Sequence, residues 1–169
     1  MMKTLLLLRH AKSSRKDTSL ADFERPLNRR GRRAAALIGR FIKRKNVLPD
    51  LILSSPAIRA RSTIEIVLES AQLKVELRYD ERLYLASAAD LLAIIRQFEE
   101  ERDTVMLVGH NSGTEDLLHR LTGVQGVMPT AALAKIALDV EKWSEVAIKL
   151  SGGRAGLEWF IKPKELVTS

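Results

Sequence analysis

The chain has no cysteine, few aromatic residues and no long apolar run. Without a thiol it cannot form a disulfide, a thiolate zinc site or a cysteine nucleophile, and a reducing compartment suits it, so we expect a cytoplasmic protein. The leucine run at residues 5–8 is far shorter than the ~20 residues that span a bilayer, and charge follows it at once, unlike a secretory signal. We therefore expect no association with a membrane.

Aromatic residues make up only 5% of the chain, and they are not interleaved with basic residues as a base-stacking surface requires. We therefore expect no nucleic-acid partner, although the net charge of +7 favours anionic partners in general. Much of this charge lies at residues 29–45, along one predicted helix. We interpret it as a solvated helix face; a basic module that binds phosphoproteins or nucleic acid is the non-enzymatic alternative.

The length of 169 residues suits one domain, which we expect to cover residues 1–169. Apolar segments predict strands at residues 3–8, 51–53, 75–79, 104–108, 131–138 and 157–161. Helical patterns follow Asn28 as an N-cap, follow Ser55 as an N-cap with Pro56 opening the helix, and cover residues 88–101 and the segment from 113 to 121. This alternation predicts an α/β fold: a three-layer sandwich with a mostly parallel open sheet and helices on both faces.

Three of the predicted strands end in side chains suited to phosphate chemistry. The first ends in Arg9 and His10, the second is followed by Arg59, and the fourth is followed by His110. Ligands bind beyond the carboxyl ends of the strands in open α/β sheets, so we expect these side chains to converge. Arginine clamps phosphate and histidine accepts transferred groups near neutral pH. The sequence therefore predicts a pocket for a dianion, built without a metal or another cofactor.

Four motifs occur in order along the chain, namely residues 8–13 (LRHAKS), 22–27 (DFERPL), 54–63 (SSPAIRARST) and 108–111 (VGHN). Together they resemble the histidine phosphatase superfamily, with its phosphoglycerate-mutase-like fold. The resemblance is strongest to the phosphohistidine phosphatases of the SixA type, and the tail at residues 157–163 is also similar. It thus extends over nearly the whole chain.

This resemblance implies a role for each of the convergent residues. His10 would be the nucleophile that becomes phosphorylated, while Arg9, Arg59 and His110 would hold the phosphoryl group. His10 must then be neutral, and we expect His110 to be cationic and to act as a further clamp.

Three neighbouring polar residues are further candidates for binding the substrate. Ser13 and Asn111 would add neutral hydrogen bonds to the phosphate. Arg25 either reaches the site from its loop or pairs with Asp22 instead.

Glu81 is the candidate proton donor, because the superfamily usually carries an acid in this region. The Gly-x-x-Glu-Gly pattern is absent at residues 85–87, however. A weak acid suits a phosphoramidate, whose imidazole leaves readily. We therefore expect a phosphatase that acts on phosphohistidine of a protein. A small-molecule phosphomonoesterase or a mutase on the same fold is the alternative.

Overall fold

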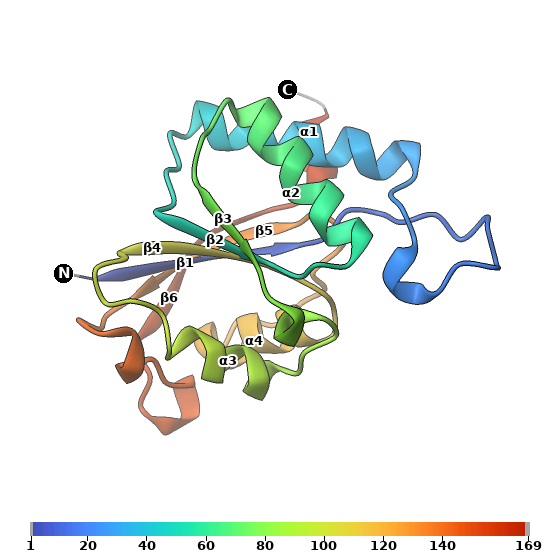
Figure 1. The fold of residues 1–169 in the computed structure, drawn as a ribbon. Helices are drawn as coiled ribbons and strands as arrows, with labels where there is room; N and C mark the ends of the chain where they lie inside the picture. The colour runs from blue at the N-terminus through green and yellow to red at the C-terminus, as the bar shows by residue number, and fades with distance from the viewer. Residues whose placement is uncertain (1, 168–169) are drawn as a thin grey trace.

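The computed structural model describes residues 2–167, which form three layers (Figure 1). The central sheet contains β1 (Lys3–Arg9), β2 (Leu51–Ser54), β3 (Glu76–Tyr79), β4 (Thr104–Gly109), β5 (Leu133–Leu138) and β6 (Ala155–Ile161). Its faces carry α1 (Arg29–Arg44) and α2 (Ile58–Ala71) on one side, and α3 (Ala88–Ile95) and α4 (Gly113–Thr122) on the other. The predicted three-layer α/β architecture is confirmed. None of the helices in the described residues is long and apolar enough to cross a membrane.

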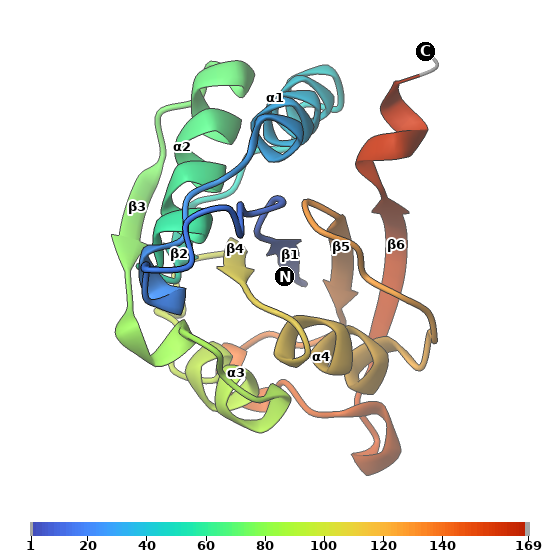
Figure 2. The ribbon, with the colours of Figure 1, turned by 90° about the vertical axis from the view of Figure 1, so that its right-hand side faces the viewer.

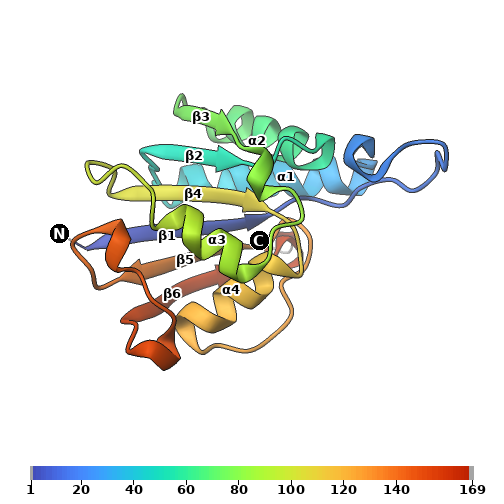
Figure 3. The same ribbon diagram turned by 60° about the horizontal axis from the view of Figure 1, so that its bottom comes forward.

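The sheet has the strand order β3-β2-β4-β1-β5-β6, which Figure 3 shows from the side of α3 and α4. The pairs β1–β4, β2–β4 and β2–β3 are parallel, whereas β5 is antiparallel to both β1 and β6. The parallel strands are joined by helices, as parallel connections require. The prediction of a mostly parallel sheet therefore holds for its centre, with an antiparallel extension on one side.

The leucine run of β1 is apolar throughout because both faces of this central strand are covered. Leu5 and Leu7 pack into the cluster beneath α3 and α4, while Leu6 and Leu8 pack into the cluster beneath α1 and α2. This alternation is the two-residue period of a strand. All four leucines are 0% exposed, and burying one such side chain contributes about 1.5–3 kcal/mol. The end of β1 is thus held rigidly between two cores.

The start of α1 is fastened to the segment that leaves β1. The predicted N-cap Asn28 accepts a hydrogen bond from the Gly31 N–H at 2.7 Å, and its own N–H donates to the Lys12 carbonyl at 3.0 Å. A Cβ on Gly31 would lie 2.2 Å from that carbonyl oxygen. Only glycine therefore allows this close approach, which fixes the loop beside the strand end.

Two predicted helix boundaries are wrong. Ala57, and not Ser55, is the N-cap residue of α2; the Ser55 hydroxyl accepts a hydrogen bond from the Ala57 N–H at 3.3 Å and is also hydrogen-bonded to His110. The third helix ends at Ile95, well before residue 101. Beyond Ile95 the chain changes to shorter turns, in which the N–H groups of Gln97 and Phe98 donate to the carbonyls three residues before them. The buried Lys3 ammonium then binds the carbonyl of Glu100 at 2.6 Å.

Candidate active site

Four predicted residues from three strand ends meet beyond the carboxyl ends of β1 and β4, the edge of the sheet that faces the viewer in Figure 2. The pairing of Arg9 with Gly109 brings the next residues, His10 and His110, side by side. Their ring centroids are 5.1 Å apart. Arg59, from the first turn of α2, places its Nε 3.4 Å from His10 Nε2. Parallel register between neighbouring strands is thus the reason for this convergence.

These residues line a cavity of about 480 Å³. The described residues around it are Arg9, His10, Lys12, Ser13, Ser14, Arg15, Lys16, Arg25, Asn28, Arg59, Leu85, His110, Asn111 and Thr130. Six of them are arginine or lysine, and none of those described is acidic. The clustered cations make a potential that attracts anions. In residues 2–167 no group of three or more histidine, aspartate or glutamate side chains is placed to hold a metal ion.

His10 uses the lone pair of Nε2 to accept a hydrogen bond from the Nε of Arg59 at 3.4 Å. Its Nδ1 lies 2.7 Å from the Ala11 carbonyl oxygen, which can only accept, so Nδ1 carries the hydrogen. Nε2 therefore holds the lone pair, and it faces the Arg59 guanidinium. Burial, with a smaller effect of the nearby arginines, lowers the pKa of His10 to about 4. At neutral pH this imidazole is uncharged, which a nitrogen nucleophile requires.

The buried Arg59 side chain is held in place by Asp22. Its guanidinium donates to the Asp22 carboxylate at 2.9 Å and to the Asp22 carbonyl at 2.6 Å. The Thr63 hydroxyl accepts from the Ala11 N–H and donates to the Arg59 carbonyl, so it ties the first turn of α2 to the end of β1. The position of the guanidinium relative to His10 is therefore set by two elements at once.

Arg9 and His110 each have a buried nitrogen without a hydrogen-bond partner. Within the described residues, Arg9 Nε and His110 Nδ1 are the buried side-chain atoms of this kind. His110 Nε2 lies 2.7 Å from the Ser55 hydroxyl, which leaves Nδ1 free. An unpaired buried donor costs about 1–3 kcal/mol, so an anion that accepts from such a donor is favoured here.

His110 is neutral in this structure, contrary to the expectation of a cationic clamp. Burial and the neighbouring His10 lower its pKa to about 3. A neutral imidazole still donates one hydrogen bond, so it can contribute to binding an anion without adding charge. The positive charge of the site comes from the arginines and lysines.

Asp22 and Tyr84 belong to the site, although the sequence did not assign them to it. The Asp22 carboxylate accepts from Arg59, from Arg25 at 3.0 Å and from the Tyr84 hydroxyl. The hydrogen bond from Tyr84 and those from the arginines hold the pKa of Asp22 well below its usual range. The Tyr84 ring also packs against the His110 ring at 5.4 Å between centroids. Asp22 lies in the DFERPL motif, but no local signal identifies Tyr84.

The three further binding candidates all line the cavity. Arg25 does both things that the sequence left open: it pairs with Asp22, and its Nη1 donates to the Ser13 hydroxyl at 2.8 Å. Asn111 is engaged elsewhere, since its amide donates to the Met128 carbonyl at 2.9 Å and its oxygen accepts from Thr114. Ser13 and Arg25 are thus placed toward an anion, while Asn111 shapes the wall.

Glu81 is not brought to this site. It opens a short 3-10 turn, Glu81–Leu83, where its side chain is exposed, and it is not among the described residues that line the cavity. The residue of this turn region that does reach the site is Tyr84, through its contacts with Asp22 and His110.

Comparison with known sequences matches residues 5–84 to the histidine phosphatase superfamily (branch 1). An uncharacterized chloroplastic protein of Arabidopsis thaliana is 33% identical over 95% of this chain and 78% of its own length. An uncharacterized protein of Mycobacterium tuberculosis is also 33% identical, over 89% of this chain and 92% of its own length.

Solved structures give the same result. A protein from Agrobacterium tumefaciens assigned as a phosphohistidine phosphatase SixA has a TM-score of 0.82 and 29% identity, covering 96% of this chain and 99% of its own. A protein histidine phosphatase SixA complexed with tungstate has a TM-score of 0.79 at 22% identity, covering 96% of this chain and 99% of its own, which shows the shared fold. On the matched family, the relatives and the fold, this chain belongs to the histidine phosphatase superfamily and is a phosphatase.

Proposed function

We propose that the protein removes phosphate from phosphohistidine of a protein through a covalent intermediate on His10. In the first step the His10 Nε2 lone pair forms a bond to phosphorus. The bond from phosphorus to the substrate imidazole nitrogen breaks, and its electron pair stays on that nitrogen. In the second step water attacks phosphorus, the bond from phosphorus to His10 Nε2 breaks, and its electron pair stays on Nε2. The proton that the water loses leaves with the inorganic phosphate or passes to solvent, and His10 is restored. Splitting the hydrolysis in this way gives two steps with lower barriers.

The remaining residues position and stabilise the transferred phosphoryl group. Arg59 lies next to the attacking nitrogen at 3.4 Å, so its guanidinium is in place for the equatorial oxygens. Arg9 Nε brings a buried donor that has no other partner, and His110 Nδ1 is a second one when the Ser55 hydroxyl donates to His110 Nε2. Phosphoryl transfer depends mainly on such positioning and charge stabilisation, which this set supplies from three separate elements.

The preference for phosphohistidine rests on one observation: no carboxylic acid is placed to protonate a leaving oxygen. None of the described cavity-lining residues is acidic, and Asp22, just beyond them, stays ionised at neutral pH because its pKa is lowered. An alkoxide leaves poorly without such an acid. Phosphoimidazole protonated on its other ring nitrogen leaves as neutral imidazole, and so it needs no acid from the enzyme. The SixA-assigned relative at 29% identity also supports this substrate class.

A substrate panel tests the proposal. We expect a 3-phosphohistidine peptide to have a kcat/KM at least 100-fold above that of a phosphoserine peptide of the same sequence and of a sugar phosphate. Brief mixing with radiolabelled phosphohistidine peptide should label wild-type protein, and peptide mapping should place the acid-labile label on His10.

His10→Ala should lose both turnover and label, whereas His119→Gln, which changes an exposed histidine of α4, should keep them. Equal rates for the phosphoserine and phosphohistidine peptides would contradict the substrate preference. Full turnover of the His10→Ala variant would contradict the intermediate.

A further inference from the structure

A second and larger hollow adjoins the catalytic cavity. It measures about 1060 Å³ and lies between α1, the C-terminal 3-10 turn Pro163–Leu166 and residues 127–130. We call it the basic groove, because its charged lining residues are Lys12, Arg30, Arg33, Arg40, Arg44, Lys162 and Lys164. None of the described residues that line it is acidic. It is therefore a strongly cationic surface outside the group of residues that surrounds His10.

The basic groove is continuous with the catalytic cavity. Lys12 and Thr130 line both hollows. Lys12 is fixed at this border, since its carbonyl accepts from Asn28 and Gly31 approaches it closely. A chain lying in the groove thus leads directly to the mouth of the cavity.

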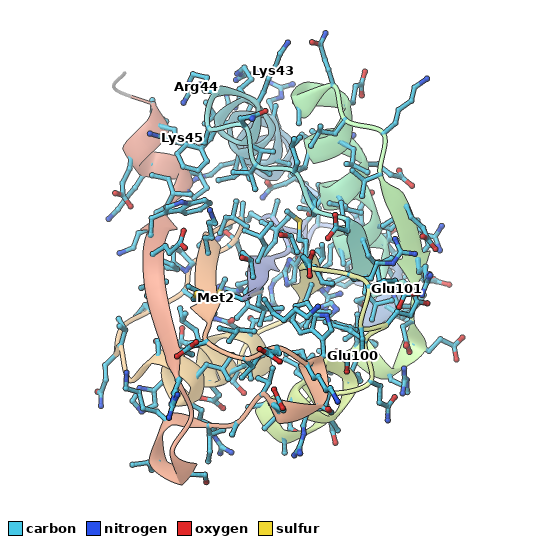
Figure 4. All side chains as sticks on the ribbon, turned by 90° about the vertical axis from the view of Figure 1, so that its left-hand side faces the viewer. Met2, Lys43, Arg44, Lys45, Glu100 and Glu101 are labelled. Atoms are coloured by element: carbon cyan, nitrogen blue, oxygen red, sulfur yellow. The ribbon has the colours of Figure 1, made fainter. Side chains whose placement is uncertain are left out.

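The groove side of α1 is a single stripe of the helix. Arg30, Arg33, Leu37, Arg40 and Arg44 follow one another at spacings of three or four residues, which places them on one face. The stripe is about 21 Å long at the rise of an α-helix. Its four arginines are exposed and make no ion pair in the described structure. Figure 4 shows Arg44 on the side of α1 toward the C-terminal segment and Lys43 on the other side.

The arginines near the N-terminus of α1 are unfavourable for the helix itself. The helix contains no aspartate or glutamate, and Arg29, Arg30, Arg32 and Arg33 all lie near its N-terminus. Cations at this end oppose the helix dipole by about 0.3–1 kcal/mol each. Helix stability therefore gives no reason for Arg30 and Arg33, which line the groove, while binding of an anionic partner does.

The floor of the groove is aliphatic. Ala34 and Leu37 of α1 face Val127, Pro129 and Pro163 across it, and no aromatic residue is among its described lining. A single-stranded nucleic acid would be expected to meet aromatic side chains on which its bases stack. An aliphatic floor between cationic rims instead complements a helix or strand with apolar residues on one side and carboxylates on its edges.

We propose that the basic groove docks an acidic, amphipathic segment of the phosphoprotein substrate and so delivers the neighbouring phosphohistidine to His10. This inference rests on the function proposed above. It assigns the arginines of α1 to substrate recognition and separates recognition from chemistry. The cations of the groove are complementary to the carboxylates of the acidic segment. Because the groove is continuous with the catalytic cavity, one substrate protein can place its acidic segment in the groove and its phosphohistidine in the cavity.

The test compares two double variants of α1. The groove variant combines Arg33→Glu with Arg40→Glu, both of which line the groove. The control variant combines Arg29→Glu with Arg32→Glu, exposed arginines of the same helix that line neither hollow. Each replacement changes the charge by two units, so both double variants fall from +7 to about +3. The probes are a 20-residue peptide with glutamates along both edges of a leucine face and one terminal 3-phosphohistidine, the same peptide unphosphorylated, and a glutamine version of each.

The unphosphorylated acidic peptide should bind the wild type in fluorescence anisotropy, and the groove variant should bind it at least 10-fold more weakly. The control variant should stay within twofold of wild type. The groove variant should also raise KM for the phosphorylated acidic peptide at least 10-fold, with kcat/KM for p-nitrophenyl phosphate within twofold of wild type. The glutamine peptides should show little difference among the three proteins.

Several results would overturn the docking proposal. They are equal losses in both double variants, equal binding of acidic and glutamine peptides, or displacement of the acidic peptide by a short RNA at similar concentration. Because binding is measured with an unphosphorylated peptide, a failure of docking is distinguishable from a failure of phosphohistidine hydrolysis.

Discussion

Lowering the pH from 7 to 5 should destabilise the fold by about 4 kcal/mol through His10 and His110. Their pKa values fall to about 4 and about 3 in the folded protein, against an ordinary value of ~6.5 in the unfolded chain. Between these values the unfolded chain binds protons that the folded protein does not, so stability falls as the pH falls. At pH 5 each histidine lowers the free energy of unfolding by about 2 kcal/mol, because the loss grows by ~1.4 kcal/mol for each pH unit below 6.5.

This loss is a large part of the ~5–15 kcal/mol that stabilises a typical domain. The other strongly shifted group at the site, Asp22, has a lowered pKa. A lowered carboxylate pKa costs stability only below its ordinary range near pH 4, so Asp22 adds little between pH 7 and 5. The expected slope near pH 5 is therefore close to two protons, or about 2–3 kcal/mol per pH unit.

Urea unfolding at pH 7, 6 and 5, followed by circular dichroism, measures this slope. His10→Asn keeps a donor toward the Ala11 carbonyl and His110→Gln keeps a partner for Ser55, so each should halve the pH dependence. His119→Gln, on the exposed side of α4, is the matched control and should leave it unchanged. A wild-type stability that is constant from pH 7 to 5, or equal slopes in all variants, would refute the reasoning.

Three further predictions concern the packing and charge of the site. Gly31→Ala should lower the free energy of unfolding by about 1–3 kcal/mol, because its Cβ meets the Lys12 carbonyl at 2.2 Å; Gly156→Ala, which has open space, should cost far less in the same urea titration. Asp22→Asn should tighten inhibition by vanadate about 3- to 10-fold, since the carboxylate competes with the anion for Arg59. Weaker inhibition would instead mean that holding Arg59 in place is the larger effect. Arg59→Lys should lower kcat/KM by about 100-fold through loss of the planar fork, whereas Arg61→Lys, whose guanidinium lies 3.9 Å from the Tyr79 ring centroid, should leave it nearly unchanged in the same assay.

The sequence predicts the sheet centre and its strand ends because these depend on local patterns. The leucine run of β1 and the Asn28 cap are visible in a few consecutive residues, and both elements form as expected. Once parallel strands are predicted, their carboxyl ends must share one edge, so the approach of His10, Arg59 and His110 follows. This much of the site is a consequence of strand order and register.

The parts that the sequence does not predict depend on contacts between distant segments. Tyr84 reaches Asp22 across 62 residues of sequence, and no spacing rule links an exposed loop to a 3-10 turn. Ser55 is a residue type favoured at N-caps, but the N-cap of α2 is Ala57, and the Ser55 hydroxyl makes a tertiary hydrogen bond to His110 besides a local one to the Ala57 N–H. Glu81 lies where the superfamily usually carries an acid, but position along the chain does not place a side chain in a cavity.

For the arginines of α1, the sequence predicts the exposed face of the helix but not the groove beside it. Their charge and helical spacing predict a solvated face, and they are indeed exposed. That four of them border a groove depends on where the C-terminal turn Pro163–Leu166 comes to lie, more than a hundred residues later. The spacing of residues in a helix predicts which of them share a face, but it does not predict which distant segment of the chain lies across from that face.

The parallel pairing of β1 with β4 also determines when the protein becomes active during folding. It joins residues 4–9 to residues 104–109, so its loop must close across most of the chain before the two histidines meet. Contacts of such high sequence separation form slowly and late. An N-terminal portion that ends before residue 110 lacks one of the two histidines, and β4 leaves the ribosome only after three of the four α-helices of the described structure. Recovery of phosphatase activity after dilution from denaturant therefore reports closure of the central sheet, not the earlier formation of helices.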